Sequence, residues 1–587
     1  MANINKDEII LGIDLGTTNS CVAVVIDKEP QIIVNEQGKR TIPSIVVIEG
    51  DDIIVGDEAK EYLLQDNKNV IYSVKRLMGS NEKLKIDGKE FSPEEISAKI
   101  LSYIKNRAEL ALNKKINKVV ITVPAYFDDG QRQATKNAGR IAGLEVLRII
   151  NEPTAAALAY GTEKEGGELN ILVYDLGGGT FDVTVLHMKE GIYTVLSTSG
   201  DNNLGGDDWD NAIATWIIEE IKKVYRTTIN MEDKNVSNKI KSYSEFVKIQ
   251  LSALDELDLD VSVFTNIQGG TIHITKAQFL EMTKVLMERT MAPVKDAITE
   301  SGLTNEKIDK VVLVGGSTKM PMVREYLQTT FGAQLDSDVN PDEVVALGAA
   351  IQGAILKGEI DAELKDVIPL SLGMETYDGT IFSIIKRNTN IPVTIADIFA
   401  TTYDDQTAID IKVFQGERPM AIDNKLLGGF EFVVDPAPKG ETEVEVSYHV
   451  DMDGILNVSS KNLKTGVVKS AVIKDTSGLD SSEINKMIKD AEKFKSSDLQ
   501  KVKDNQLIQI IWDYLNILIA YVQDNEKDIP PFFNKQKSIE WIEKVSVWIE
   551  SNDVEQIKAN IFAFQLHVNT SLHDEIRKGA KIGFKMS

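Results

Sequence analysis

Two carboxylates flank a run of three glycines in residues 171–185, ILVYDLGGGTFDVTV. The pattern predicts an apolar strand, a glycine turn and a second strand, so the segment is a hairpin rather than a strand followed by a helix. Glycine has no Cβ, so its N–H group can approach an anion closely. Asp175 ends the first strand and Asp182 lies just past the turn. A phosphate cradle beside two carboxylates indicates a site for Mg²⁺ and a polyphosphate.

A near copy of this segment occupies residues 9–25, IILGIDLGTTNSCVAVV, and contains Asp14. Either hairpin alone could be an ordinary strand pair with a polar turn. Two of them, one small domain apart, indicate an internal duplication. Each hairpin would then hold phosphates from its own side of a cleft, with a metal between the aspartates.

Other candidates lie along the same part of the chain. Lys75 could reach a γ-phosphate or could simply be solvated, and Glu152 could cap the helix that follows or face a metal-bound water. Gly315 and Gly316 join a strand to a helix, a junction where the backbone can approach a nucleoside. The patterns GxxxxGK[ST] and GxGxxG opening a helix are absent, which excludes those two nucleotide-binding folds.

Changes in periodicity divide the chain into four parts. Residues 1–357 alternate strand-like and helical runs, as in α/β domains, and residues 358–370 form a short charged linker. Residues 371–476 show period-two alternation with recurring turn signals, which predicts a β-sandwich. Residues 477–587 are helical in pattern, with a capping signal at Asp480 and Glu483. Trp541 and Trp548 lie seven residues apart, which favours a helix core over a docking surface.

Composition narrows the class of protein. The chain has 587 residues, 42% hydrophobic and 26% charged, with a formal net charge of −25. This charge argues against nucleic-acid binding, because polyanions are held by basic surfaces. Cys21 is the one cysteine, so an intrachain disulfide is impossible and a reducing compartment is expected. We expect a cytoplasmic protein without a secretory signal or a membrane-spanning segment.

Long motifs, in order along the chain, resemble the seventy-kilodalton heat-shock chaperones of bacteria. They are GIDLGTTNS, VPAYF, IINEPTAAALAYG, VYDLGGGTFDV, LGGDDWD, LVGGSTKMP, NPDEVVALGAA, PLSLG and GER. The resemblance runs from about residue 9 to about residue 492, and the short span between Met78 and Phe91 is similar to the Gram-positive and mycoplasma form. It implies an actin-like ATPase domain, a linker, a peptide-gripping β-sandwich and a helical lid.

The resemblance also implies roles for individual residues. The family's phosphate and metal positions fall on Asp14, Gly16, Thr17, Thr18, Asn19, Asp175, Gly177, Gly178, Gly179, Thr180 and Asp182, with Asp14 and Asp175 as the metal ligands. Lys75 falls on the lysine that contacts the γ-phosphate and Glu152 on the acid near the attacking water, so Lys75, Glu152, Asp175, Thr180 and Asp182 form the catalytic set. Contacts to nucleoside and phosphate fall on Gly205, Gly206, Glu245, Lys248, Ser252, Gly315, Gly316, Ser317, Lys319 and Asp342.

Two further sets follow from the same resemblance. Pro124, Arg132 and Asp366 fall on positions that couple the nucleotide state to the linker. Met374, Tyr377, Phe399, Thr402, Ile409 and Ile411 fall on the peptide cleft. The implied ligands are ATP or ADP with Mg²⁺, and K⁺ as a further ion. The implied partners are unfolded polypeptides, a J-domain co-chaperone and a GrpE-type exchange factor, with no nucleic acid.

Several positions depart from the family pattern. The linker has Glu363-Leu364-Lys365 before Asp366 where family members have an apolar run. Each lost apolar contact would be worth about 1.5–3 kcal/mol, so weaker coupling between the domains is expected. Lys319 replaces an arginine that stacks on adenine, and lysine lacks the planar guanidinium. Tyr377 and Thr402 replace the residues that arch over bound peptide, and the resemblance ends near Phe494.

Three hypotheses follow. The first is an ATP-driven chaperone in which hydrolysis, stimulated by a J-domain partner, switches the peptide cleft from open to closed. The second is a divergent relative that binds ATP and peptide with weakened coupling, as a holdase or adaptor. The third is a sugar kinase or filament-forming actin relative, which shares the two hairpins but does not account for the β-sandwich and lid.

Overall fold

The computed structural model describes most of the chain. The described residues are 8–34, 38–50, 52–62, 69–86, 88–163, 167–201, 203–265, 267–336, 339–472, 507–508, 511–512, 514–516, 518–519, 522–523, 534–551 and 553–579. The predicted capping signal at Asp480 and Glu483 lies outside them, as does Phe494.

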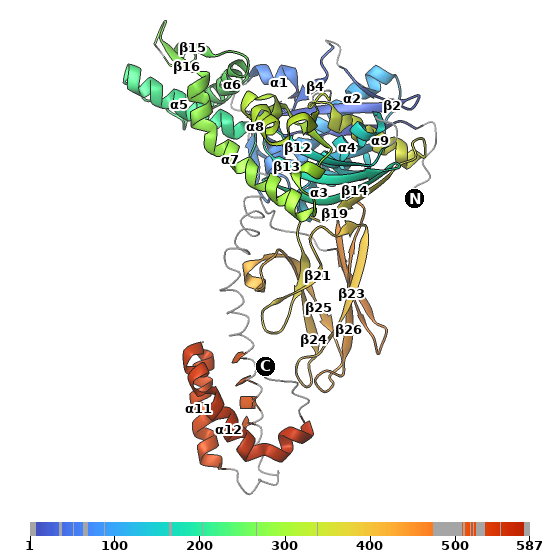
Figure 1. The fold of residues 1–587 in the computed structure, drawn as a ribbon, viewed down its shortest axis with the longest axis vertical. Helices are drawn as coiled ribbons and strands as arrows, with labels where there is room; N and C mark the ends of the chain where they lie inside the picture. The colour runs from blue at the N-terminus through green and yellow to red at the C-terminus, as the bar shows by residue number, and fades with distance from the viewer. Residues whose placement is uncertain are drawn as a thin grey trace. The chain divides into compact units, whose positions relative to one another are not determined.

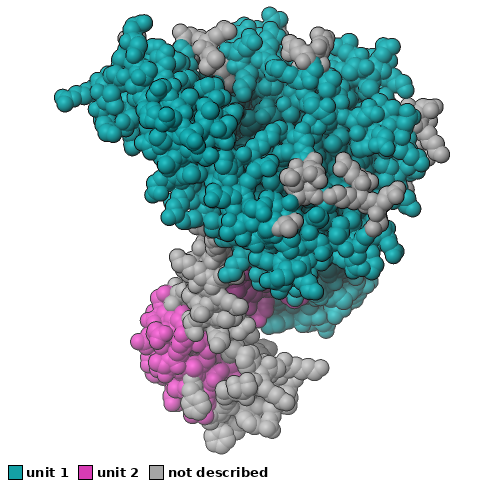
Figure 2. Space-filling model, turned by 45° about the horizontal axis from the view of Figure 1, so that its top comes forward, with its two compact units in different colours: residues 1–373, 383–416, 425–487 teal, residues 374–382, 417–424, 488–587 magenta. Residues whose placement is uncertain are grey.

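The chain divides into two compact units, coloured separately in Figure 2. The first contains residues 1–373, 383–416 and 425–487, and the second contains residues 374–382, 417–424 and 488–587. The α/β part and most of the β-sandwich therefore belong to one unit. The second unit combines two short segments of the sandwich with the C-terminal helices.

The first sheet of the α/β part has strand order β11-β10-β1-β2-β3, with β4 paired to β2. Figure 1 labels β2 and β4 among its strands. Its strands are β1 (Ile10–Asp14), β2 (Asn19–Ile26), β3 (Glu29–Ile32), β4 (Thr41–Pro43), β10 (Lys118–Val123) and β11 (Glu145–Asn151). Strands β1 and β2 form the predicted antiparallel hairpin, with Asp14 opposite Cys21. The Cys21 side chain is buried, as expected for a small apolar residue.

The second sheet has strand order β18-β17-β12-β13-β14-β19-β22. Its strands are β12 (Leu169–Leu176), β13 (Phe181–Lys189), β14 (Ile192–Asp201), β17 (Lys310–Val314), β18 (Leu335–Asp336), β19 (Glu363–Val367) and β22 (Asn390–Ile391). Five strands repeat the first sheet in order and direction, because β12 pairs antiparallel with β13 and parallel with β17, as β1 does with β2 and β10. This repetition is the structural form of the predicted duplication.

Helices α4 and α9 pack on each other and on strands β12 and β1 of the two sheets. The helices of the α/β part are α1 (Asp57–Glu61), α2 (Pro93–Leu112), α3 (Asp129–Ile141), α4 (Glu152–Glu163), α5 (Gly206–Tyr225), α6 (Lys234–Leu251), α7 (Lys276–Glu300), α8 (Pro321–Phe331) and α9 (Val344–Lys357). Capping boxes begin α2 at Ser92, α3 at Asp128 and α7 at Thr275, so their starts are fixed locally.

Small antiparallel hairpins complete the α/β part. They are formed by β5 (Val46–Glu49), β6 (Asp52–Val55) and β7 (Val70–Ile71), by β8 (Leu84–Ile86) with β9 (Lys89–Phe91), and by β15 (Glu256–Asp260) with β16 (Thr271–Thr275). The short 3-10 helices η2 (Val74–Leu77) and η5 (Gly316–Lys319) carry Lys75 and Ser317.

The β-sandwich has two four-stranded sheets, in the orders β21-β20-β24-β25 and β23-β26-β27-β28. The strands are β20 (Leu372–Glu375), β21 (Ile381–Ile385), β23 (Val393–Ala400), β24 (Ala408–Gln415), β25 (Lys425–Val433), β26 (Glu443–Val450), β27 (Leu456–Asn462) and β28 (Val468–Val472). Alternate residues such as Ile411, Val413, Val446 and Tyr448 are buried, as the period-two pattern predicts.

The C-terminal helices α11 (Lys535–Glu550) and α12 (Val554–Gly579) pack with described parts of residues 507–523 around a small apolar core. The rings of Trp541 and Trp548 meet edge to face at 6.3 Å, and Trp541 also contacts Phe564. The tryptophan spacing therefore marks a helix core, as predicted. Within the described ranges, no helix is long and apolar enough to cross a membrane.

Candidate nucleotide site and interdomain contacts

A cavity of about 350 Å³ lies between the two duplicated hairpins. Its lining includes Asp14 at the end of β1, Asp175 near the end of β12, and Gly315 after β17. Of the residues predicted for phosphate, metal, catalysis or nucleoside, it contains Asp14, Gly16, Thr17, Thr18, Asn19, Lys75, Glu152, Asp175, Gly177, Gly178, Thr180, Glu245, Lys248, Ser252, Gly315, Gly316, Ser317, Lys319 and Asp342. Residues from seven separate parts of the sequence thus meet in one cavity.

Four predicted residues do not line this cavity. Asp182 is fully buried and lies directly opposite Asp175 on the neighbouring strand of the hairpin. Gly179 accepts a hydrogen bond from Arg76 Nη2 at 3.1 Å. Gly205 and Gly206 start α5, where Gly206 N donates to Gly177 O at 2.9 Å. These glycines let α5 approach the hairpin turn.

Close approach explains two of the glycines. A Cβ on Gly178 would lie 1.9 Å from Thr18 Oγ1, so a side chain there would separate the two hairpins. Gly315 has φ +81°, a conformation that other residues rarely adopt. The N–H of Gly177 donates to Thr180 O at 2.9 Å and is committed to closing the turn. Among the three consecutive glycines, phosphate binding by backbone N–H groups therefore depends on Gly178 and Gly179.

Lys75 and Glu152 form a buried ion pair, with Nζ and Oε1 2.5 Å apart. Lys75 also lies 5.7 Å from the centre of the Phe127 ring. Both charged groups face the cavity rather than bulk solvent, which excludes the interpretation of Lys75 as an ordinary solvated lysine.

Buried carboxylates give the cavity its electrostatic character. Burial, reinforced by Glu152, raises the pKa of Asp14 to about 7 and that of Asp182 to about 8. Burial and Glu152 also raise the pKa of Asp175 well above its usual value. Such groups hold protons near neutral pH unless a cation stabilises their charged form.

The donor set fits Mg²⁺. The buried Oδ2 of Asp175 has no hydrogen-bond partner among the described residues, so an oxygen is available for a cation. No cluster of three or more His, Cys, Asp or Glu at metal-binding spacing occurs in the described part of the chain. Mg²⁺ does not require one, because it is usually held by one or two carboxylates together with water and substrate phosphates.

The end of the cavity for which nucleoside contacts are predicted is held by ion pairs. Lys248 Nζ lies 2.9 Å from Asp210 and 3.0 Å from Gly206 O, and Lys319 pairs with Asp342. Asp210 also lines the cavity, and burial raises its pKa to about 6. It was missed in the sequence, although it closes the motif LGGDDWD. The apolar residues Ile249, Met320 and Val345 were missed as well, because isolated aliphatic residues give no signal.

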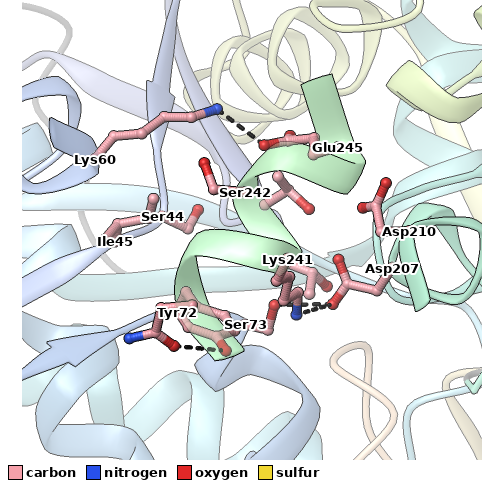
Figure 3. A pocket seen from close by; sticks show the side chains of 13 residues that line it. Ser44, Ile45, Lys60, Tyr72, Ser73, Asp207, Asp210, Lys241, Ser242 and Glu245 are labelled. Atoms are coloured by element: carbon pink, nitrogen blue, oxygen red, sulfur yellow. Dashed lines mark hydrogen bonds and ion pairs between the residues drawn. The ribbon is translucent and has the colours of Figure 1, made fainter. Parts of the chain in front are cut away.

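A second, smaller pocket of about 50 Å³ lies where the two duplicated halves meet, shown in Figure 3. Lys60 of α1 pairs with Glu245 of α6 at 3.1 Å, and Tyr72 donates to Asn238 at 3.3 Å. Ser73 donates to Asp207 at 2.9 Å, and Lys241 lies over the Tyr72 ring. These contacts close the cleft between the halves.

The coupling candidates meet beside the linker. Arg132, which is buried on α3, donates to Asn151 Oδ1 at 2.7 Å and to Phe127 O at 3.0 Å. Asn151 donates in turn to Asp366 Oδ2 at 2.9 Å. Burial lowers the pKa of Arg132 and raises the pKa of Asp366. Pro124 directly follows β10, and Arg132 donates to the next carbonyl, that of Ala125, at 3.1 Å.

The β-sandwich is attached to the α/β part through the start and the middle of α3 and through Ile149 of β11. Buried Lys425 lies 3.3 Å from Asp128, and Leu456 N donates to Asp129 at 2.7 Å. Asp453 accepts from Ile149 N at 2.9 Å and pairs with Lys136. None of these residues was assigned a role from the sequence, because their partners lie about 300 positions away.

The predicted peptide-cleft residues are divided between the units. Ile409 and Ile411 are buried on β24, Phe399 lies on β23, and Thr402 N donates to Gln406 at 2.8 Å. Met374 and Tyr377 belong to the second unit.

Comparison with known proteins agrees with this architecture. The family model described as Hsp70 protein matches residues 10–85 and 80–576. The chain therefore belongs to the Hsp70 family. The match continues well past residue 492, so the helical region resembles the family further than the sequence motifs indicated.

Relatives named Chaperone protein DnaK align with nearly the whole chain. One from Ureaplasma urealyticum is 48% identical over 563 residues, covering 94% of this chain and 93% of that protein. One from Mycoplasmopsis synoviae is 46% identical over 560 residues, with the same coverage, and one from Mycoplasma mobile is 47% identical over 560 residues. These matches support an Hsp70-type ATP-dependent chaperone function with ATPase activity.

Replacing Lys75 by methionine should slow single-turnover ATP hydrolysis by about 10²- to 10³-fold, because a cation facing the reacting phosphate is lost. Nucleotide affinity should change much less. Lys85→Ala is the matched control, since Lys85 is an exposed lysine in the following hairpin. An unchanged hydrolysis rate in K75M would remove Lys75 from the catalytic set.

Binding of Mg²⁺ with ADP should release protons, because Asp14 and Asp182 carry raised pKa values. Affinity should therefore rise between about pH 6 and about pH 8. Calorimetry in buffers of different ionisation enthalpy measures the protons released. If no protons are released at pH 7 and the affinity for Mg²⁺ with ADP does not change with pH, the prediction that Asp14 and Asp182 hold protons before binding is contradicted.

Replacing Lys60 by alanine should speed ADP release about two- to fivefold, as expected for losing a partly exposed ion pair between the halves. Lys39→Ala is the matched control, since Lys39 pairs with Asp57 within the first half. Stopped-flow release of a fluorescent ADP analogue measures both. Equal rates for the two variants would show that the Lys60–Glu245 pair does not hold the cleft closed.

Proposed function

We propose that this protein couples ATP binding and hydrolysis in the cavity to capture and release of extended apolar segments by its β-sandwich. The observation that carries the proposal is that strand β19 (Glu363–Val367) of the linker pairs with two other strands. It pairs with β14 of the ATPase sheet, and also with β22, the short strand that lies in the chain between sandwich strands β21 and β23. A strand held on both edges can transmit a change in one domain to the other.

The residues of the cavity have distinct tasks. Asp14 and Asp175 would hold Mg²⁺, which supplies charge neutralisation on the phosphates when bound. Lys75 places a positive charge at the reacting phosphate, and Glu152 orients water. Asp182, opposite Asp175 on the neighbouring strand, and Thr180, in the turn between these strands, complete the predicted catalytic set. The Lys75–Glu152 pair already sets these two side chains in place. K⁺ as a further ion remains a prediction.

The linker's charges do not prevent it from docking. Glu363 and Lys365 keep 59% and 44% of their side chains exposed, whereas Leu364, Asp366 and Val367 are buried. The alternation of a strand therefore directs the charged residues outward. Docking relies on main-chain pairing, on Leu364, and on Asp366, which accepts from Asn151, Thr154 and its neighbour Val367 N.

A continuous set of contacts joins the cavity to the linker. Lys75 faces Phe127, Phe127 O accepts from Arg132, and Arg132 contacts Asn151, which donates to Asp366. Asn151 is also the chain neighbour of Glu152, the partner of Lys75. These contacts support an ATPase that controls linker docking, and they favour it over a relative with uncoupled domains.

Client binding is assigned to the sandwich. An extended polypeptide would bind by main-chain hydrogen bonds, with aliphatic side chains near Ile409 and Ile411. A J-domain co-chaperone, a GrpE-type exchange factor and a cytoplasmic location remain predictions from the family.

Steady-state ATP hydrolysis measured with and without an unfolded apolar peptide tests the proposal, together with peptide release on adding ATP. We expect peptide to raise turnover several-fold and ATP to speed release. If peptide and ATP both bind but neither affects the other, the protein is an uncoupled holdase or adaptor.

Replacing Asp366 by alanine should abolish the stimulation of hydrolysis by peptide and leave peptide binding intact, because the linker loses its buried side-chain anchor. Lys365→Ala is the matched control: it is the neighbouring residue on the outward face of the same strand. Stimulation of D366A equal to that of K365A would contradict the role given to the anchor.

A further inference from the structure

A small pocket adjoins the nucleotide cavity beside Lys75. It has a volume of about 20 Å³ and shares Thr17, Lys75 and Thr180 with the lining of the larger cavity. A space of this size holds about one water molecule. The two spaces therefore meet at the residue that is predicted to face the γ-phosphate.

The rest of this pocket is lined mainly by hydrogen-bond donors. Its remaining lining residues are Arg76, Phe127, Gln131 and Asn203. None of the lining residues within the described ranges is an aspartate or a glutamate, although the chain has a formal net charge of −25. Cations beside amides and hydroxyls bind oxyanions such as phosphate. The pocket therefore suits an anion, whereas the buried aspartates of the nucleotide cavity suit a cation.

Arg76 lies on the solvent side of this pocket. Its side chain is 25% exposed, whereas that of Lys75 is 6% exposed. Its Nη2 donates to Gly179 O at 3.1 Å and lies 3.2 Å from Asp208 Oδ2. Its buried Nε has no hydrogen-bond partner in the described part of the chain and lies 3.9 Å from Asp207 Oδ2. Because buried donors are nearly always paired, this N–H is available to a ligand in the pocket.

Gly179 makes room for Arg76 at the glycine turn. A Cβ on Gly179 would lie 2.7 Å from Arg76 Nε and 2.9 Å from Thr17 Cγ2. Any side chain at this position would therefore displace the guanidinium from the wall of the pocket. Gly179 thus admits Arg76 to the turn, a role that the nucleotide cavity alone does not give it.

The order of the products in the cavity calls for a second opening. If ATP is cleaved beside Lys75, ADP lies between the free phosphate and the end of the cavity that holds the nucleoside. A phosphate that leaves before ADP must then leave by another route. The small pocket begins at Lys75, but it admits phosphate only when the Arg76 side chain moves, because its present volume fits about one water molecule.

We propose that this pocket is the exit site for the inorganic phosphate formed by ATP hydrolysis, with Arg76 as its gate. This inference rests on the proposed function, because it requires ATP to be cleaved beside Lys75. The Arg76 guanidinium exchanges Gly179 O for the oxygens of the phosphate and moves outward with it. Lys75 remains inside, where its charge faces the Mg²⁺-bound ADP.

The test is one turnover of ATP that carries separate radiolabels in the adenine and in the γ-phosphate, on the full chain with Mg²⁺. Acid quenching gives the extent of hydrolysis, and rapid filtration gives the cleaved phosphate and the ADP that are still bound. Arg76→Ala should shorten the lifetime of bound phosphate about three- to tenfold relative to that of ADP, because the hydrogen bonds that hold the gate are lost.

Ser73→Ala is the matched control for R76A, because Ser73 directly precedes the same 3-10 helix and donates to Asp207 at 2.9 Å. It should leave the ratio of the two lifetimes unchanged. If R76A shortens the lifetimes of phosphate and ADP by the same factor, Arg76 acts only on the cleft between the two halves and the inference is wrong.

Asn203→Phe tests the passage from a different wall, because Asn203 lines the small pocket and not the nucleotide cavity. The larger side chain should lengthen the lifetime of bound phosphate several-fold. Asn117→Phe is the matched control, at an exposed loop position before β10. Equal phosphate lifetimes in N203F, N117F and the unaltered protein would overturn the inference. Slower hydrolysis in N203F with an unchanged phosphate lifetime would assign the pocket to entry of water and would also overturn it.

Failure of this inference differs from failure of the proposed function. An unchanged hydrolysis rate in K75M would mean that ATP is not cleaved beside Lys75, and the proposed tasks of the cavity residues would then be wrong. Hydrolysis that is slowed in K75M, together with equal phosphate lifetimes in R76A, N203F and the unaltered protein, would overturn the exit site alone.

Discussion

The structure depends on one covalent constraint, the bond between Asn151 and Glu152. Asn151 ends β11 and donates to Asp366 in the linker, while Glu152 begins α4 and pairs with Lys75 in the nucleotide cavity. Because the two residues are neighbours in the chain, we propose that a displacement of Glu152 is transmitted to the anchor of the linker.

The side chains around Glu152 are buried, so the charge of a bound ligand affects them strongly. Lys75 and Glu152 are each about one-tenth exposed or less, and Asp14, Asp175 and Asp182 surround them in a low-dielectric cavity. In such surroundings a phosphate or a magnesium ion changes interaction energies far more than it would at the surface. The interface with the sandwich uses similar means, since Lys425 and Asp128 form a buried ion pair. Breaking a buried ion pair costs free energy, so this pair favours one particular alignment of the sandwich on the α/β part.

Much of the nucleotide site could be predicted from the sequence, because its signals are local. A strand, an aspartate and a glycine turn fix a hairpin within about fifteen residues, and the repeat of that unit indicates the duplicated sheets. Asp14, Asp175 and Gly315 were therefore identified before any tertiary contact was known. The same reasoning missed Asn151, Asp210 and Lys425, whose roles depend on partners distant in the chain.

The linker shows why sequence alone was insufficient. Glu363 and Lys365 looked unfavourable when compared with an apolar run, since sequence does not show which face of a strand is buried. The structure shows a strand paired on both edges, so main-chain hydrogen bonds replace part of the missing apolar contact. The division into compact units was equally hidden, because it follows contacts between loops far apart in the chain.

The central claim is that nucleotide controls whether β19 is docked between the two domains. Amide hydrogen exchange of residues 363–367 in the full chain, with ATP and then with ADP and bound peptide, measures this directly. The account predicts strong protection with ATP and fast exchange with ADP and peptide, because the strand loses its partners when the domains separate. Equal protection in both states would contradict it, and the linker would then be a fixed structural strand rather than the element that couples the domains.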